Sequence, residues 1–291
     1  MKPAVGVVGV GNMGGAMAAR LLELGWPVQV CDIDPVKVRA LEAQGAAGRS
    51  DAAQTAAGCA ALIVCVVDAA QTREVLFGHG GAAAAMQPGQ AVLLCPTISP
   101  QDVEDIALRL AGGGIAAIDA PMSGGPARAR DGSMSLMVAC AEADFDRHQA
   151  LIEALSCKVF RLGQRPGDGA RTKLVNNLLA GINLAGAAEA MAMAQRMGLD
   201  LGRTLEVIEQ SSGQSWIGSD RMRRALAGDY APRAHLALLQ KDTRLAVEAA
   251  SAVGFSGPLG AVASDLFARA AAAGLAHLDD AALLKLLSQQ A

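Results

Sequence analysis

Aromatic residues, paired cysteines and long apolar runs are scarce or missing in this chain of 291 residues. Aromatic side chains make up 3% of it and its net charge is −3, so it lacks the stacking platforms and basic surface typical of nucleic-acid-binding proteins. Its six cysteines form no C-x-x-C pair and its four histidines stand singly, which argues against a zinc site or a disulfide framework. No apolar stretch reaches membrane-spanning length, and no signal peptide precedes the first expected strand. We therefore expect a cytoplasmic protein without bound metal, nucleic acid or membrane.

What the chain does contain is a large apolar fraction arranged in two patterns. Hydrophobic residues make up 52% of it and charged residues 18%, which suits a sizeable core and two domains. Up to residue 164, short apolar runs alternate with helical periodicity, and this pattern predicts a doubly wound parallel sheet whose last strands are mixed. From residue 165 onward only helical periodicity remains. The sequence thus predicts an α/β fold of Rossmann type over 1–164 and an all-α domain over 165–291. Because the alanine- and methionine-rich helices offer more apolar surface than a small domain needs, we expect a homodimer or homotetramer.

A strand, a glycine loop, a helix, a second strand and an acid follow one another at the N-terminus, an order that predicts a dinucleotide site. Gly9 permits the tight turn, Gly11 lets the backbone approach a pyrophosphate, and Gly14 lets the helix pack against the strand. The free N–H groups at the helix start face the phosphates. The segment that we expect to contact the cofactor comprises Gly9, Gly11, Asn12, Met13 and Gly14.

Asp32 closes the second strand and bears on the choice of cofactor. Its carboxylate suits the free ribose hydroxyls of NAD and repels the 2′-phosphate of NADP. Ile33 follows it, where no arginine is available to hold a phosphate. The sequence therefore favours NAD over NADP.

Lys173 and Asn177 are the first candidates for chemistry, because they are four residues apart and share a face of the long helix expected to begin near Asp168. A lysine there could exchange a proton with a substrate hydroxyl while hydride moves to the nicotinamide, provided that burial or nearby positive charge lowers its pKa. Asn177 could orient the substrate. The alternative is that Lys173 is a solvated surface charge.

Three further segments follow expected strands or lie late in the chain. Ser123, Gly124 and Gly125 offer a hydroxyl and consecutive N–H groups that suit a carboxylate, unless they form an ordinary glycine turn. Thr97, at a strand end, could touch the nicotinamide ribose. Lys241 could close over the cofactor or be an exposed helical charge. We expect the site in the crevice between the two domains.

These segments, in this order, make the whole chain resemble the β-hydroxyacid dehydrogenase family, whose members include 3-hydroxyisobutyrate dehydrogenases, tartronate semialdehyde reductases and L-threonate dehydrogenases. The resemblance is carried by GVVGVGNMGGAMAARLL, DAPMSGG and GDGARTKLVNN. It implies that Lys173 is the general acid/base, that Ser123, Gly124 and Gly125 grip the substrate carboxylate, and that Asn177 orients it. It also implies that Val66, Thr97 and Lys241 lie near the cofactor.

The substrate is a small hydroxy acid on this resemblance. The run GDYAPRAHLALLQKD is most similar to L-threonate dehydrogenases, which favours a four-carbon sugar acid such as L-threonate. A smaller acid, 3-hydroxyisobutyrate or tartronate semialdehyde, is the alternative. A cofactor-binding scaffold without turnover and an imine reductase are disfavoured, since relatives of those kinds have lost or replaced the lysine.

Overall fold

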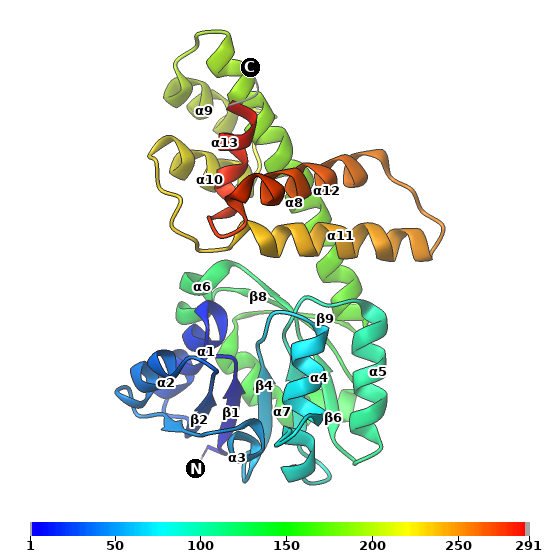
Figure 1. The fold of residues 1–291 in the computed structure, drawn as a ribbon. Coiled ribbons are helices and arrows are strands. Elements are labelled where there is room, and N and C mark those ends of the chain that lie inside the picture. The colour runs from blue at the N-terminus through cyan, green and yellow to red at the C-terminus, as the bar shows by residue number, and fades with distance from the viewer. Residues whose placement is uncertain (1, 289–291) are drawn as a thin grey trace. The chain divides into compact units, whose positions relative to one another are not determined.

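The computed structural model describes residues 2–288 (Figure 1). Within them the chain divides, between Lys173 and Leu174, into two compact units. The N-terminal unit contains nine strands, seven helices and the start of an eighth: β1 (Val5–Val8), α1 (Asn12–Glu23), β2 (Val28–Cys31), α2 (Pro35–Glu42), β3 (Ala47–Gly48), α3 (Ala52–Ala56), β4 (Ala61–Val64), α4 (Ala69–Phe77), β5 (Ala91–Leu94), α5 (Pro100–Ala111), β6 (Ala116–Asp119), β7 (Met122–Ser123), α6 (Gly125–Asp131), β8 (Ser135–Ala139), α7 (Glu142–Leu155), β9 (Lys158–Gly163) and α8 (Asp168–Arg196).

The strands of the N-terminal unit form one sheet in the order β3-β2-β1-β4-β5-β6-β8-β7, with β9 paired to β8. Strands β3 to β6 are parallel, β8 is antiparallel to β6 and β7, and β9 is parallel to β8. The expected doubly wound sheet with mixed final strands is confirmed. Because parallel strands end at the same edge, the loops after β1, β2, β4, β5 and β6 meet at the carboxyl edge of the sheet.

Helices cover both faces of this sheet, which explains why its central strands are apolar throughout (Figure 1). One core packs α1 and α7 against the sheet through Met17, Leu21 and Ile152. The other packs α4 and α5 against the opposite face through Leu76, Val103 and Ile106, among others. All six of these side chains are at most 1% exposed.

Two parts of the N-terminal unit differ from the sequence expectation. The sequence pattern did not predict the short helix α6 after Gly124, and the strands β3 and β7 are two residues each, too short to leave a periodic signal. The long helix, expected to begin near Asp168, has Asp168 as its first helical residue. The carboxylate of Asp168 is paired with Arg165 and Arg171.

The C-terminal unit is helical, as expected, and is built on the rest of α8. It adds α9 (Leu201–Glu209), α10 (Trp216–Leu226), α11 (Leu236–Ala252), α12 (Pro258–Ala270) and α13 (Leu283–Ser288). Its core joins α8, α10 and α12 through Leu184, Met222 and Phe267. Gly181 allows α11 and α12 to approach α8, because a Cβ there would fall 2.5 Å from the Thr243 methyl group. Within residues 2–288, none of the helices combines the length and apolarity that crossing a bilayer requires.

Candidate active site

The glycine loop begins where β1 ends, and its geometry depends on two close backbone approaches. Gly9 has a φ of +87°, in the left-handed region that favours glycine, and its N–H donates to the Cys31 carbonyl at 3.0 Å. A Cβ on Gly14 would lie 2.0 Å from the Gly9 carbonyl oxygen. Any side chain at Gly14 would therefore force the first turn of α1 away from β1, as the sequence predicts for this position.

Gly11 differs from its neighbours because no protein atom lies within 4 Å of the position that its Cβ would take. The space beside the loop is thus open on the side where a ligand can approach the backbone. Gly11 is also the N-cap of α1 and provides no side-chain hydrogen bond to the helix. The first N–H groups of α1 remain available to an anion, which is the arrangement that a dinucleotide pyrophosphate requires.

Asp32 lies directly after β2 and is held by the backbone on both sides. Its Oδ2 accepts a hydrogen bond from the N–H of Val10 at 2.7 Å, and its Oδ1 accepts one from Asp34 at 2.9 Å. Ile33 beside it is fully exposed. Asp32 therefore contacts the glycine loop through the backbone of Val10. The spacing of these segments along the chain did not reveal this contact.

Val66 and Thr97 follow β4 and β5, at the same edge of the sheet as the glycine loop. A Cβ on Gly9 would lie 3.0 Å from Cγ1 of Val66, so this side chain packs directly against the turn. Thr97 is half-buried. Two residues later, Ser99 caps α5 by accepting a hydrogen bond from the Asp102 N–H at 3.0 Å, with Pro100 as the first helical residue, a pairing of residue types that is typical of a helix start.

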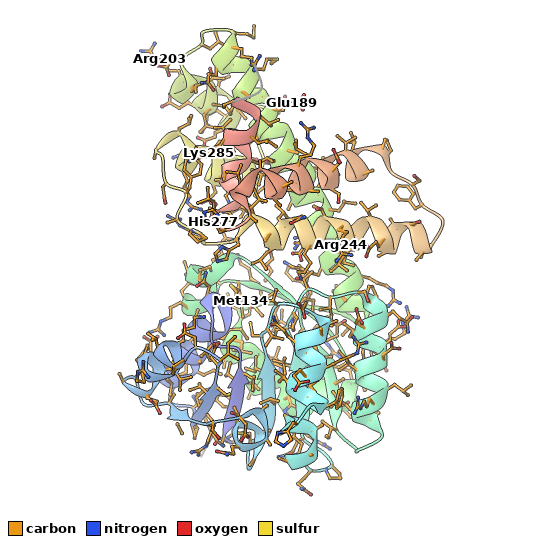
Figure 2. All side chains as sticks on the ribbon, viewed as in Figure 1. Met134, Glu189, Arg203, Arg244, His277 and Lys285 are labelled. Atoms are coloured by element: carbon orange, nitrogen blue, oxygen red, sulfur yellow. The ribbon has the colours of Figure 1, made fainter. Side chains whose placement is uncertain are left out.

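The Ser123–Gly125 loop follows β6 and has a backbone that only glycine adopts without strain. Gly124 has a φ of +132° and Gly125 a φ of +76°. A Cβ on Gly124 would lie 3.2 Å from Cα of the buried Met134, which Figure 2 labels. No protein atom approaches the equivalent position on Gly125 within 4 Å, so the loop is open there.

Lys173 lies near the start of α8, and its side chain is buried, with the residue 7% exposed. The first turn of this helix is fixed by Asp119, the last residue of β6. Asp119 Oδ2 accepts hydrogen bonds from the backbone N–H groups of Gly167 at 2.8 Å and Ala170 at 3.0 Å. Burial raises the pKa of Asp119 to about 6, although the backbone N–H groups of Ala170, Gly167 and Gly169 oppose that rise. The carboxyl end of the sheet and the helix that carries Lys173 are thus joined by one side chain.

In the C-terminal unit, Asn177 is held by an acid on a neighbouring helix. Its Nδ2 donates to Oδ2 of Asp242 on α11 at 2.6 Å, and both residues are buried. The other oxygen of Asp242 forms an ion pair with Lys241 at 3.0 Å. Asn176 also donates to Oδ1 of Asn177 at 3.0 Å. Asn177 is therefore fixed in orientation, one helical turn after Lys173 on α8.

Sequence reasoning named the segments that contain Asp119 and Asp242 but gave neither acid a role. Asp119 bonds to a backbone group 48 residues away and Asp242 to a side chain 65 residues away. The sequence signal that could have identified Asp119 was its position, because it ends an apolar strand whose carboxyl end was expected at the site. Among the described residues, no group of three or more histidine, cysteine or acidic side chains is arranged to hold a metal ion.

Comparison with known proteins agrees with this geometry over both units. Residues 4–163 match the family model described as the NAD binding domain of 6-phosphogluconate dehydrogenase. Residues 167–287 match the model described as NAD-binding of NADP-dependent 3-hydroxyisobutyrate dehydrogenase. The chain belongs to the β-hydroxyacid dehydrogenase family.

Curated relatives cover nearly the whole chain. It is 39% identical to L-threonate dehydrogenase of Escherichia coli strain K12 over 98% of this chain and 94% of that protein. It is 37% identical to 3-hydroxyisobutyrate dehydrogenase of Pseudomonas aeruginosa, with 97% of each chain covered. Among solved structures, 3-hydroxyisobutyrate dehydrogenase from Salmonella typhimurium matches with a TM-score of 0.93 and 37% identity, over 98% of this chain and all of that one.

Membership in this family makes the protein an oxidoreductase that acts on a CH–OH group and binds a nicotinamide cofactor. The residues present suit such a cofactor, because the open space beside Gly11, the uncapped start of α1 and the fixed carboxylate of Asp32 are the features that a dinucleotide requires. The family that the sequence motifs predicted is therefore confirmed.

Proposed function

We propose that this protein transfers hydride between a four-carbon sugar acid, with L-threonate as the best candidate, and NAD, and that Lys173 is the general acid/base. The observation that carries this proposal is the placement of Lys173, a buried lysine one helical turn before an asparagine that is fixed by Asp242. A lysine is rarely buried in a protein unless its amine interacts with a partner. An amine in that position suits proton exchange with a hydroxyl group.

Each remaining site residue has a proposed role that fits its position. Ser123, Gly124 and Gly125 hold the substrate carboxylate through the Ser123 hydroxyl and backbone N–H groups at an open, glycine-specific turn. Asn177 orients the substrate. In oxidation, the Lys173 amine takes the hydroxyl proton while the C–H electron pair leaves with its hydrogen, and in reduction it returns that proton.

A bound nicotinamide supplies the hydride acceptor or donor. The residues proposed to contact this cofactor are Gly9, Gly11, Asn12, Met13, Gly14, Asp32, Val66, Thr97 and Lys241. The preference for NAD over NADP rests on Asp32, whose carboxylate disfavours an added phosphate, and on the exposed Ile33 beside it. We propose that residues 1–164 form the dinucleotide domain and that residues 165–291 form the helical domain for substrate binding and oligomerisation.

The choice of L-threonate rests on similarity. Several relatives, at 35 to 39% identity, are named L-threonate dehydrogenases. Within the chain, Arg233, Ala234 and His235 follow Pro232, and the resemblance implies an aromatic residue two positions after this proline in many family members. The run 228–242 is most similar to that of L-threonate dehydrogenases, which supports the same choice.

A second candidate is a smaller substrate, because relatives named 3-hydroxyisobutyrate dehydrogenase and 2-hydroxy-3-oxopropionate reductase match at 37% and 32% identity. We also propose a homodimer or homotetramer, on the basis of the exposed apolar side chains of the helical unit, such as Val175, Leu179 and Leu259. The proposed location is the cytoplasm, which is where unpaired cysteines are typical.

A substrate panel tests the proposal directly. Nicotinamide absorbance is followed with L-threonate, D-threonate, 3-hydroxyisobutyrate and glycerate, each with NAD and with NADP, and 2-hydroxy-3-oxopropionate is tested in the reducing direction. We expect kcat/KM to be highest for L-threonate with NAD. A higher value for one of the three-carbon-chain acids would establish the second candidate. Tight cofactor binding without turnover of any acid would instead favour a scaffold that has lost catalysis.

A further inference from the structure

Asp119 bridges two parts of the N-terminal unit that the proposed function uses. It ends β6, where its backbone pairs with Leu94 of β5, and it lies four residues before Ser123. One oxygen of its carboxylate accepts the N–H groups of both Gly167 and Ala170 at the beginning of α8. The same short strand end therefore leads into the Ser123–Gly125 loop and bonds to the helix that carries Lys173.

The face of α8 that meets Asp119 is also the face that carries Lys173. A Cβ on Gly169 would lie 2.9 Å from Cγ of Asp119 and 2.9 Å from the carbonyl oxygen of Met137. Gly169 therefore faces the sheet closely, without room for a side chain. Because residues four positions apart on a helix point in nearly the same direction, Lys173 extends from the side of α8 that Asp119 fixes.

We propose that Asp119 is a positioning residue, which sets the place of the Lys173 amine relative to the Ser123–Gly125 loop by binding the first turn of α8. This inference rests on the proposed function, since it is Lys173 as the acid/base that gives the position its importance. A small shift of the helix start displaces the amine from the hydroxyl group with which it exchanges a proton.

The charge of Asp119 makes this connection sensitive to pH. An ionised carboxylate accepts two backbone N–H groups more strongly than a protonated one, and it also interacts favourably with the positive end of the helix dipole. The titratable groups that face Asp119 are Asp168 on α8, which raises its pKa, and the thiols of Cys95 and Cys140. Burial raises the pKa of Cys140 to about 11 and also raises the pKa of Cys95 well above its ordinary value, so both thiols are neutral near pH 6.

Three variants separate positioning from a general effect on the fold. Asp119→Ala removes the acceptor, whereas Asp119→Asn keeps an oxygen that can accept both N–H groups but removes the charge. Glu104→Gln is the matched control, because Glu104 on α5 contacts the same first turn of α8 through a 2.6 Å ion pair with Arg171. That ion pair is partly exposed and is expected to contribute little.

We expect Asp119→Ala to lower kcat by about 10- to 100-fold, the cost of misplacing a catalytic group by about an ångström, while the NAD dissociation constant stays unchanged. Asp119→Asn should retain kcat within about threefold of wild type at pH 8, since asparagine and aspartate are comparable acceptors at a helix start. The wild-type kcat should decline below about pH 6, and Asp119→Asn should lose that inflection. Glu104→Gln should match wild type throughout.

A second readout does not depend on turnover. The rate at which an amine-reactive acylating reagent labels Lys173, measured by peptide mass spectrometry at pH 8, should change in Asp119→Ala and stay at the wild-type value in Glu104→Gln. If the wild-type protein oxidises no hydroxy acid, the proposed function fails, and this labelling still tests the positioning. A folded Asp119→Ala variant with wild-type kcat and wild-type labelling would overturn the inference. So would an Asp119→Asn variant that retains the inflection near pH 6.

Discussion

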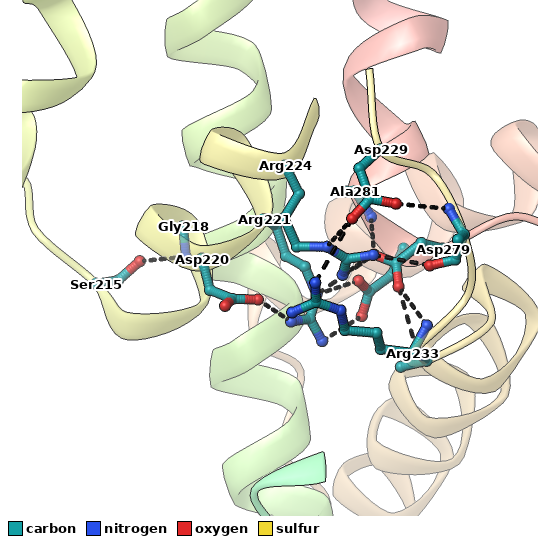
Figure 3. Close-up of polar contacts among 12 residues, drawn as sticks. Ser215, Gly218, Asp220, Arg221, Arg224, Asp229, Arg233, Asp279 and Ala281 are labelled. Carbon is teal, nitrogen blue, oxygen red and sulfur yellow. Dashed lines mark hydrogen bonds and ion pairs between the residues drawn. The ribbon is translucent and has the colours of Figure 1, made fainter. Parts of the chain in front are cut away.

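Buried carboxylates occur in both units, but their partners differ. In the N-terminal unit, Asp119 accepts hydrogen bonds from backbone N–H groups at the start of a helix. In the C-terminal unit, Asp279 and Asp280 lie among arginines, and Arg221 and Arg224 are themselves buried (Figure 3). Asp119 thus holds the start of the helix that carries Lys173. Asp279 and Asp280 instead pair with buried arginines inside a helical core.

The C-terminal cluster links residues 279–281, which precede α13, to α10 and the loop after it. Asp279 forms an ion pair with Arg224 at 3.0 Å and accepts backbone N–H groups from Arg233 at 2.8 Å and Ala281 at 3.2 Å (Figure 3). Arg221 contacts both Asp280 and Asp220. Removing one member of such a cluster leaves buried charges without partners, which is why it bears on stability rather than on chemistry.

This contrast predicts that substitution of Lys173 changes turnover more than stability, while substitutions in the C-terminal cluster do the reverse. The largest effect is expected at Lys173. Lys173→Ala should lower kcat by about 10²- to 10⁴-fold, the usual contribution of an acid/base group, with the NAD dissociation constant little changed. Steady-state kinetics and cofactor titration measure both quantities, with Lys37→Ala as the exposed control. Retained turnover would remove Lys173 from the mechanism.

The second effect concerns the C-terminal cluster. Asp279→Ala leaves Arg224 and the backbone N–H groups of three residues, Arg233, Ala234 and Ala281, without their acceptor in a fully buried position. We therefore expect a loss of about 3–5 kcal/mol in the free energy of unfolding. Urea denaturation followed by circular dichroism measures it. Asp229→Ala, at the exposed rim of the same cluster, should cost much less, because water screens its ion pair with Arg224. Equal losses in the two variants would show that burial does not govern the cluster.

The third effect concerns the cofactor loop. Asp32→Ala should weaken NAD binding by about 10- to 100-fold, because it removes charge-assisted hydrogen bonds to the ribose and to the Val10 N–H. NADP binding should weaken less, since the repulsion of its phosphate is removed together with those bonds. Fluorescence titration with both cofactors decides this, and Asp34→Ala, which removes the N-cap of α2 and an exposed ion pair with Lys37, is the control. An unchanged preference for NAD would contradict the role of Asp32.

A further expected effect is a pH dependence of stability. Burial raises the pKa of Asp280 to about 7, from an ordinary 3.8, against the opposing charge of Arg221. Since the folded state then binds a proton that the unfolded state has lost, the free energy of unfolding should fall as pH rises from about 4 to about 7. Asp119, with a pKa of about 6, contributes in the same direction up to that pH. Thermal melting between pH 4 and 8 should show a shallower slope in Asp280→Asn than in wild type, and an identical slope would exclude Asp280 as its source.

Several parts of the molecule were predictable from residue order because their physical causes are local. The turn at Gly9, the close packing at Gly14, the Ser99–Pro100 start of α5 and the long helix α8 each depend on residues within one or two turns of chain. The helix α6 was not predicted, because two glycines with positive φ immediately precede it and the sequence there is typical of a loop.

The roles of the buried acids were beyond sequence reasoning for a different reason. Asp119 meets Gly167 across 48 residues, and Arg221 meets Asp280 across 59. Such contacts are created when strands and helices pack, and neither periodicity nor motif spacing encodes which distant donor a carboxylate will face. The local order of glycines, strand ends and the α8 lysine indicated a dinucleotide site, and the resemblance of those motifs to a known family indicated a hydroxyacid dehydrogenase. Packing alone established that one buried acid fixes the helix of that lysine and that others are neutralised by arginines, because a charge removed from water takes its partners from whatever the fold brings within reach.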